Sequence, residues 1–111
     1  MKKTVVVFFV LATVIACKEK EAVIDPSQKK IVYDPDIKNI MFSYCLTCHS
    51  GSSAISGLDL SSYQKVKDAV ENKQLVHFIN NANNPMPPSG LMPASERQKI
   101  ENWVQNGFLE N

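Results

Sequence analysis

The sequence predicts an all-α domain, and three observations support this fold class. Apolar residues recur at helical spacing in residues 37–44, and a second stretch of this kind, residues 94–106, ends at Gly107. No segment shows several alternating apolar and polar runs separated by turns, as the strands of a sheet would. The 111 residues suffice for one small domain. Because a domain of this size has a modest core, a covalently held cofactor would help to stabilise it.

Residues 1–16 predict an export signal of the lipoprotein type. Lys2 and Lys3 precede the apolar run TVVVFFVLATVIA, which is shorter than the ~20 residues that a membrane-spanning helix needs. The segment from Val14 to Cys17 resembles a lipobox, so we expect cleavage before Cys17 and lipid attachment to it. The alternatives are an uncut membrane helix and cleavage elsewhere. The lipoprotein interpretation predicts an exported protein, anchored to a membrane and facing the periplasm or the cell surface.

Residues 17–33 predict a flexible tether between the lipidated Cys17 and the domain. Their first half is charged, and Pro26 and Ser27 interrupt any regular period. As an alternative for the last few residues, Ile31 to Tyr33 could pack on the domain as an ordered arm. Cleavage would leave 10 basic and 11 acidic side chains. This balance gives no reason to expect binding to nucleic acid.

The domain is predicted to span residues 34–111 and to begin with a helix. Asp34 is a favourable cap, proline suits the first helical position, and Asp36 places an acid in the first turn. The spacing i, i+3, i+4, i+7 then gives one apolar face, formed by Ile37, Ile40, Met41 and Tyr44. This helix leads directly into Cys45.

The rest of the domain predicts further helices and one shaped loop. Ser61 or Ser62 could cap a second helix, and residues 73–80 could form a third. The stretch NNPMPPSG excludes regular structure because of its prolines. Residues 94–106 predict a last helix, with an apolar face of Ile100, Trp103 and Val104. Gly107 follows where a left-handed residue is expected, and Phe108 could close over Trp103.

The stretch CLTCH, residues 45–49, is the main candidate for chemistry. A thioredoxin-like redox pair would begin a helix after a strand, whereas these cysteines end a helix. A structural zinc site needs four ligands, and His77 is the only further histidine. A c-type haem needs two thiols for its vinyl groups and an adjacent histidine for its iron. We therefore predict covalent haem attachment to Cys45 and Cys48, with His49 as an axial ligand.

The second axial position has several candidates in the sequence. Met41 shares the helix that leads into the motif and is predicted to be core, and Met92 begins the last helix, where methionine is often core filler. Met86 lies between two prolines, which would hold its thioether in place. We therefore favour Met86 over Met92. His77 remains the alternative that would give two histidine ligands.

Three segments together resemble the small monohaem class I cytochromes c, especially short membrane-tethered bacterial ones. They are IKNIMFSYCLTCHS, GLDLSSY, and MPPSG followed by ERQKIENWVQNG, and the resemblance covers residues 34–108. It implies about four short helices around one covalently bound haem c. It also implies Met86 as distal ligand, Trp103 as core beside the first helix, and Leu58 and Leu60 in the haem pocket. Pro93 departs from the serine or threonine cap that is common there.

The expected function is single-electron transfer, without catalysis of a substrate reaction. The haem pocket is expected to include Ile40, Met41, Leu58, Leu60 and Trp103. Partners would be redox proteins, a donor dehydrogenase or reductase and an acceptor oxidase or reductase, met at the membrane to which the lipid anchors the chain. The alternatives are a haem subunit of a larger redox complex and an open haem site acting as a sensor or peroxidase. The sequence contains no catalytic dyad, phosphate loop or nucleotide fingerprint.

Overall fold

The first helix of the domain begins where the sequence predicts. In the computed structural model, which describes residues 29–111, Asp34 is extended and the chain turns helical after it, first in the wide turn η1 (Tyr33–Ile37) and then in α1 (Lys38–Tyr44). The Asp34 carboxylate accepts a hydrogen bond from Lys38 Nζ at 2.7 Å. The Asp36 carboxylate accepts one from the Val32 backbone N–H at 3.2 Å. Neither carboxylate accepts from an N–H group of the helix, so the predicted capping by Asp34 is wrong: the structure makes no side-chain capping bond at this helix start.

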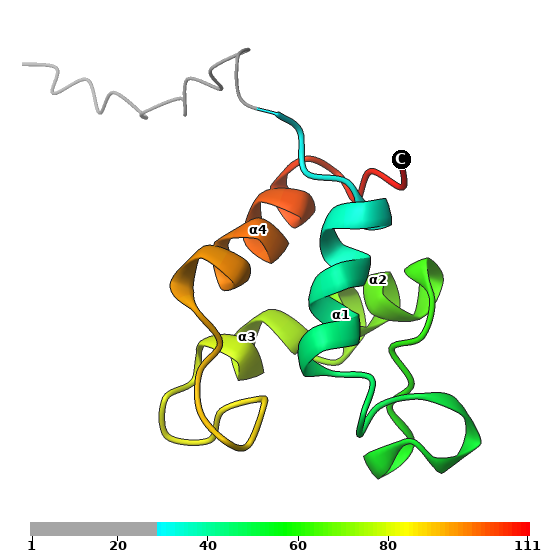
Figure 1. Ribbon diagram of the computed structural model, residues 1–111, viewed down its shortest axis with the longest axis vertical. Coiled ribbons are helices and arrows are strands. Elements are labelled where there is room, and N and C mark those ends of the chain that lie inside the picture. The colour runs from blue at the N-terminus through cyan, green and yellow to red at the C-terminus, as the bar shows by residue number, and fades with distance from the viewer. Residues whose placement is uncertain (1–28) are drawn as a thin grey trace, which may run out of the picture.

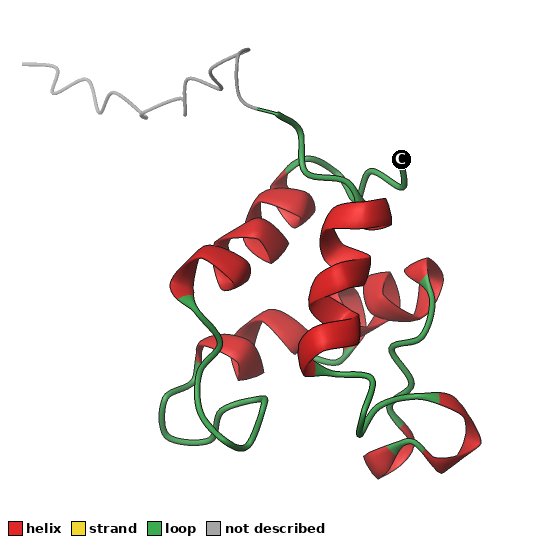
Figure 2. Ribbon diagram, in the orientation of Figure 1, coloured by secondary structure: helices red, strands yellow, loops and turns green. Residues whose placement is uncertain are grey.

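Three more α-helices follow, and residues 29–111 contain no strand, which confirms the all-α class. Two short turns, η2 (Gly51–Ser53) and η3 (Ile55–Gly57), follow the cysteine motif. The helices are α2 (Tyr63–Asn72), α3 (Leu75–Asn80) and α4 (Ala94–Gln105). Figure 1 shows α4 beside the upper part of α1, with α2 and α3 lower in the molecule, and Figure 2 shows that loops connect them. No helix within the described residues is long and apolar enough to cross a membrane.

The apolar face of α1 is buried over most of its length. Ile37, Ile40 and Met41 are 0%, 3% and 1% exposed, as the helical spacing predicts. Tyr44 was expected on this face but is 37% exposed, so that part of the prediction is wrong. It is the last residue of α1, and the backbone leaves helical geometry at Cys45. The core therefore ends one turn before the end of the helix.

The residues before Asp34 pack on the domain. Tyr33 is 7% exposed, and Ile31 contacts the core. The Tyr33 N–H donates to the Leu109 carbonyl at 2.8 Å, and the Asp34 N–H donates to the Glu110 carbonyl at 3.0 Å. Apolar burial and these two bonds favour the ordered arm over a free tether at this point. The packed domain thus extends beyond the predicted boundary at residue 34 to Ile31.

The predicted signal, residues 1–16, lies outside the described residues. Cys17 and the first part of the predicted tether lie outside them as well.

An aromatic cluster joins the two ends of the domain around Trp103, which is fully buried. The ring centroids of Phe108, Tyr33 and Tyr63 lie 5.0, 6.0 and 6.1 Å from that of Trp103. The indole Nε1 donates to the Leu109 carbonyl at 2.8 Å, which satisfies its only polar group. This cluster confirms that Trp103 is core and packs beside the start of the first helix.

The end of α4 also confirms the predicted role of Gly107. Gly107 has a φ of +78°, and its N–H donates to the Val104 carbonyl at 3.0 Å. The N–H of Phe108 donates to the Trp103 carbonyl at 3.0 Å. This pair of bonds, with contact between the two side chains involved, is the Schellman motif. It places the Phe108 ring over Trp103.

The middle helices differ from the prediction only near their ends. Ser62 precedes α2 as its cap residue, but its side chain makes no capping bond. The predicted third helix starts at Leu75 rather than at residue 73, because Lys73 still donates to α2 and Gln74 is left-handed with φ +57°. Residues 81–93 contain no helix, as their prolines predict. Pro93 takes the cap position of α4, with extended backbone.

Candidate functional site

The two cysteines occupy one turn of backbone at the end of α1. Cys45 is the residue at which the helix ends, and its carbonyl accepts from the N–H of Cys48 at 3.2 Å and of His49 at 2.9 Å. Both cysteines are free thiols, Cys45 partly buried and Cys48 exposed. A turn closed in this way holds two sulfur atoms and an imidazole within a short span of chain. The motif therefore has the local order that attachment to one flat group requires.

The protonation state of Cys45 does not suit a dithiol redox centre. Burial raises the pKa of the Cys45 thiol to about 11. Reactive redox cysteines have a lowered pKa, because the thiolate is the attacking species. Cys45 also lies at the C-terminal end of its helix, where the helix dipole disfavours a negative charge. The geometry thus agrees with the exclusion of a thioredoxin-like pair.

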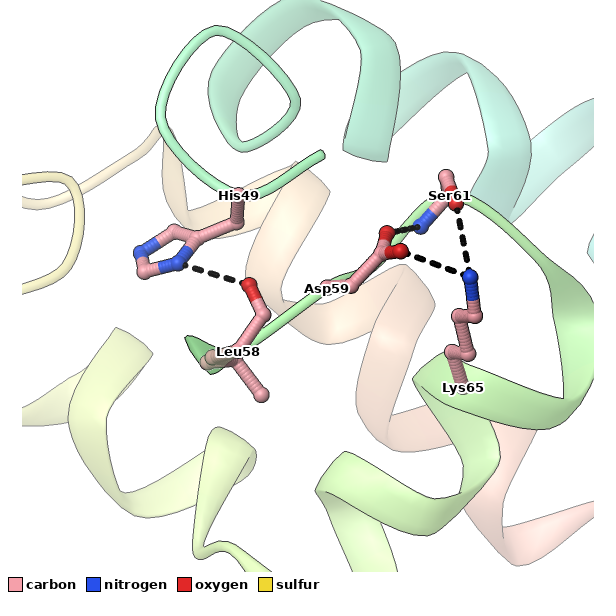
Figure 3. A network of polar contacts seen from close by, with 5 residues as sticks. All are labelled: His49, Leu58, Asp59, Ser61 and Lys65. Atoms are coloured by element: carbon pink, nitrogen blue, oxygen red, sulfur yellow. Dashed lines mark hydrogen bonds and ion pairs between the residues drawn. The ribbon is translucent and has the colours of Figure 1, made fainter. Parts of the chain in front are cut away.

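The His49 ring is fixed by the segment that follows the turns η2 and η3. Its Nδ1 atom lies 3.1 Å from the Leu58 carbonyl oxygen, the contact drawn as a dashed line in Figure 3. A carbonyl only accepts, so this contact requires a proton on Nδ1 and leaves the lone pair on Nε2. The Leu60 N–H also donates to the His49 carbonyl at 2.8 Å. Backbone and ring are therefore both held, and Nε2 is the nitrogen free to bind a metal.

A charged cluster secures the acceptor segment next to Leu58. The Asp59 carboxylate accepts from Lys65 Nζ at 2.6 Å and from the Ser61 N–H at 2.9 Å, as Figure 3 shows. These bonds hold the pKa of Asp59 well below its usual range, and the bond from Lys65 has a larger effect than the bond from Ser61. Lys65 lies on α2. The segment whose carbonyl orients His49 is thus bound to α2.

The four methionine and histidine candidates for the second axial position differ in exposure. Met41 and Met92 are 1% and 4% exposed and belong to the core, as predicted. Met86 is 37% exposed, and its backbone N–H donates to the Phe78 carbonyl on α3 at 3.1 Å. His77 is exposed on the same helix. Among these three methionines Met86 is therefore the exposed one, and it lies in a loop anchored to α3.

The motif and the Met86 loop lie at the same end of the molecule. In Figure 1 the chain after α1 and the loop between α3 and α4 both lie at the lower end. Exposed apolar side chains occur in these segments, with Ile55 at 57% and Leu91 at 40%. Two thiols, an imidazole with a free Nε2, a thioether and apolar side chains form a donor set that fits a haem.

The predicted pocket residues fall into two groups. Ile40, Met41 and Leu60 are buried in the core, and Leu58 is half-buried beside it. Trp103 packs with Tyr33 near the start of the first helix, whereas the motif follows the end of that helix. The structure therefore does not bring Trp103 and the motif together, and contact between Trp103 and the haem stays a prediction.

A separate cleft of about 260 Å³ lies between α1 and α4. Its lining is mainly polar and includes Asp36, Glu96 and Lys99. Such a lining does not suit an apolar macrocycle. This cleft is not part of the candidate site.

Sequence reasoning missed the partner of His49. The Leu58 carbonyl is a backbone group, so any side chain at this position could supply it. The short chain length between the motif and the stretch GLDL is the only sequence feature that indicates contact between the two segments. The sequence predicts a role for the Leu58 side chain in the haem pocket but none for its carbonyl.

Comparison with protein families agrees with the site. Residues 45–90 match the family described as Planctomycete cytochrome C, and this segment contains the motif, the His49 partner and Met86. No curated protein and no solved structure matches the chain. The family match indicates a haem-based electron carrier that acts with redox partners. Together, the motif, the helical fold and this match support a small cytochrome c with covalently bound haem c.

Proposed function

We propose that the protein transfers single electrons through a haem iron held by His49 and Met86. The observation that carries this proposal is the contact between His49 Nδ1 and the Leu58 carbonyl, which leaves Nε2 free for iron. The haem, covalently attached at Cys45 and Cys48, supplies one-electron oxidation and reduction of its iron. Met86 is the exposed methionine of the chain segment that the structure describes.

The residues around the two ligands favour transfer of an electron with little rearrangement. His49 is held by the Leu58 carbonyl and by the Leu60 N–H. Met86 is held by its bond to the Phe78 carbonyl and by the prolines on either side. Ligands that keep their positions in both oxidation states lower the cost of reorganisation. A methionine ligand also raises the reduction potential relative to a second histidine.

Absorption spectra of the haem-loaded protein test the ligand assignment. Methionine bound to ferric haem gives a weak charge-transfer band in the far red. We expect this band in the wild-type protein, its loss in Met86→Ala, and its retention in the matched control Met92→Ala. A band that survives in Met86→Ala and disappears in Met92→Ala would assign the ligand to Met92. Absence of the band from the wild-type protein would rule out methionine ligation and favour His77 or an open iron.

We also propose that the domain is anchored to a membrane through Cys17. This proposal rests on residues 1–16, which have the pattern of a lipoprotein signal, and on the charged segment that follows Cys17. A domain held in this way would exchange electrons with a donor and an acceptor at the membrane surface. The test is fractionation of cells that produce the wild-type protein or Cys17→Ser. The wild-type protein should float with membranes and Cys17→Ser should not; equal flotation of both would exclude lipid anchoring at Cys17.

A further inference from the structure

The loop that carries Met86 is tied at both ends by one side chain. This loop, residues 81–93, leaves α3 after Asn80 and enters α4 at Ala94. Arg97, in the first turns of α4, donates from Nη1 to the side-chain Oδ1 of Asn80 at 2.6 Å. The same guanidinium donates from Nε to the backbone carbonyl of Met92 at 3.1 Å. Arg97 therefore joins the residue before the loop to the last part of the loop.

The orientation of the Asn80 amide is fixed by its other contacts. Its Nδ2 donates to Glu101 Oε1 at 2.8 Å and to the Val76 carbonyl at 3.0 Å. The amide oxygen thus faces a cation and the amide nitrogen faces an anion, and a flipped amide would lose both interactions. Arg97 and Glu101 lie one turn apart on α4, so Asn80 bridges two side chains of the same helix. All of these groups are partly buried, which strengthens the bonds relative to exposed ones.

Within the loop, few other bonds hold Met86. Its N–H donates to the Phe78 carbonyl, and the Gly90 N–H donates to the Pro87 carbonyl at 3.1 Å. The first bond connects Met86 to α3 only. The last loop residue, Pro93, is bound to α4 because its carbonyl accepts from the N–H groups of Glu96 and Arg97 at 3.0 and 3.2 Å. Before Pro93, the side-chain bond from α4 to the loop is the one from Arg97 to the Met92 carbonyl, and Met92 is 4% exposed. If Arg97 were lost, the loop could move away from α4 while α3 and α4 remained formed.

We propose that Arg97 is a positioning residue that holds the Met86 loop closed and thereby restricts access of external ligands to the distal side of the haem. This inference rests on the proposed ligation by Met86. Arg97 acts through the Asn80 side chain and the Met92 carbonyl. The fork of the guanidinium suits this role, because its Nε and Nη1 donors point to two acceptors at once. A lysine could retain the charge but could not make both bonds in this geometry.

The test is the affinity of the ferric, haem-loaded protein for imidazole, followed by its absorption spectrum. When only molecules with an open loop bind imidazole, the apparent affinity equals the intrinsic affinity multiplied by the fraction of open molecules. Arg97→Met keeps much of the apolar stem and removes the two bonds. We expect this variant to bind imidazole about five- to thirty-fold more tightly than the wild-type protein. This range corresponds to a loss of about one or two kcal/mol from the free energy that keeps the loop closed. The far-red methionine band should also disappear at a lower temperature. The imidazole affinity of Arg97→Lys should lie between those of the wild-type protein and Arg97→Met.

The matched control is Lys99→Met, on the same helix. Lys99 pairs with Glu96 within α4 at 3.0 Å and makes no bond to the loop. We expect its imidazole affinity to equal that of the wild-type protein. Far-ultraviolet circular dichroism establishes that each variant is folded. Asn80→Ala, which removes the acceptor of the Arg97 Nη1 bond, is a second test variant, and we expect its imidazole affinity to rise as well.

Three outcomes would overturn the inference. Unchanged imidazole affinity in both Arg97→Met and Asn80→Ala, with the methionine band present in the wild-type protein, would limit Arg97 to a structural role while leaving the proposed function intact. An equal rise in Lys99→Met would indicate a general loosening of α4. A wild-type protein without a Met86-dependent band would overturn both the ligand assignment and the inference.

Discussion

His49 Nδ1 lies 3.1 Å from the carbonyl oxygen of Leu58. The contact links the attachment motif to a segment nine residues further along the chain, after the turns η2 and η3. Since Asp59 directly follows Leu58, the ion pair of Asp59 with Lys65 helps to determine where this carbonyl lies. The orientation of the iron ligand thus depends on an electrostatic contact outside the haem site.

Replacement of Asp59 should reduce stability in a pH-dependent way. The bonds from Lys65 and Ser61 hold the pKa of Asp59 below its usual range, so the ionised carboxylate stabilises the folded state. That contribution is fully present above the unfolded pKa of about 3.9 and is lost as the pH falls below it toward the folded pKa. We expect Asp59→Asn to be less stable than the wild-type protein in urea at pH 7, and the difference to shrink at pH 3.

The control for this prediction is Asp34→Asn, which removes a more exposed ion pair with Lys38. Surface pairs of this kind contribute little to stability. A stability loss in Asp59→Asn that is the same at pH 7 and pH 3 would contradict the account, because it would assign the effect to something other than the charge of Asp59.

Truncation of Trp103 should be strongly destabilising. Its side chain is fully buried, contacts three aromatic rings and donates to the Leu109 carbonyl. Removal of a buried aromatic side chain costs about 3 to 5 kcal/mol. Phe42, on α1, is 74% exposed, and Phe42→Ala should change the free energy of unfolding by no more than about 0.5 kcal/mol. Urea unfolding of the haem-loaded proteins measures both, and similar losses in the two variants would show that the cluster around Trp103 is not a core.

Two tyrosines provide a matched test of where the packed domain begins. Tyr33 is 7% exposed and Tyr44 is 37% exposed. We expect Tyr33→Ala to lower the free energy of unfolding by about 2 kcal/mol or more, because it removes buried aromatic area. Tyr44→Ala should have a smaller effect. If Tyr33→Ala were as stable as the wild-type protein, the arm before Asp34 would contribute nothing and the domain would begin at the predicted boundary.

The sequence predicts most of the helices because local signals agree with one another. Asp34, Pro35 and the apolar spacing after them locate the first helix, and Gly107 locates the end of the last one. Phe108 over Trp103 could be predicted because the Schellman motif couples backbone and side chain at fixed offsets. The start of α3 could not be predicted, since the left-handed Gln74 has no strong sequence signal.

The candidate site was predictable to the extent that it depends on side-chain chemistry at short spacing. Cys45, Cys48 and His49 lie within five consecutive residues, and each has a distinct chemical role. The contact of His49 with Leu58 and the bonds of Arg97 to Asn80 and Met92 join residues that are 9, 17 and 5 positions apart. Two of them use backbone acceptors, which leave no mark on composition or spacing. They could be found only from the folded chain.

Exposure of the reduced, haem-loaded protein to carbon monoxide tests most directly whether the iron is closed by Met86. The account predicts no change in the absorption spectrum of the wild-type protein, because both axial positions are occupied by His49 and Met86. Met86→Ala should bind carbon monoxide and serves as the positive control. Binding to the wild-type protein as strong as to Met86→Ala would contradict the account, since it would show an open iron suited to sensing or peroxide chemistry rather than to electron transfer alone.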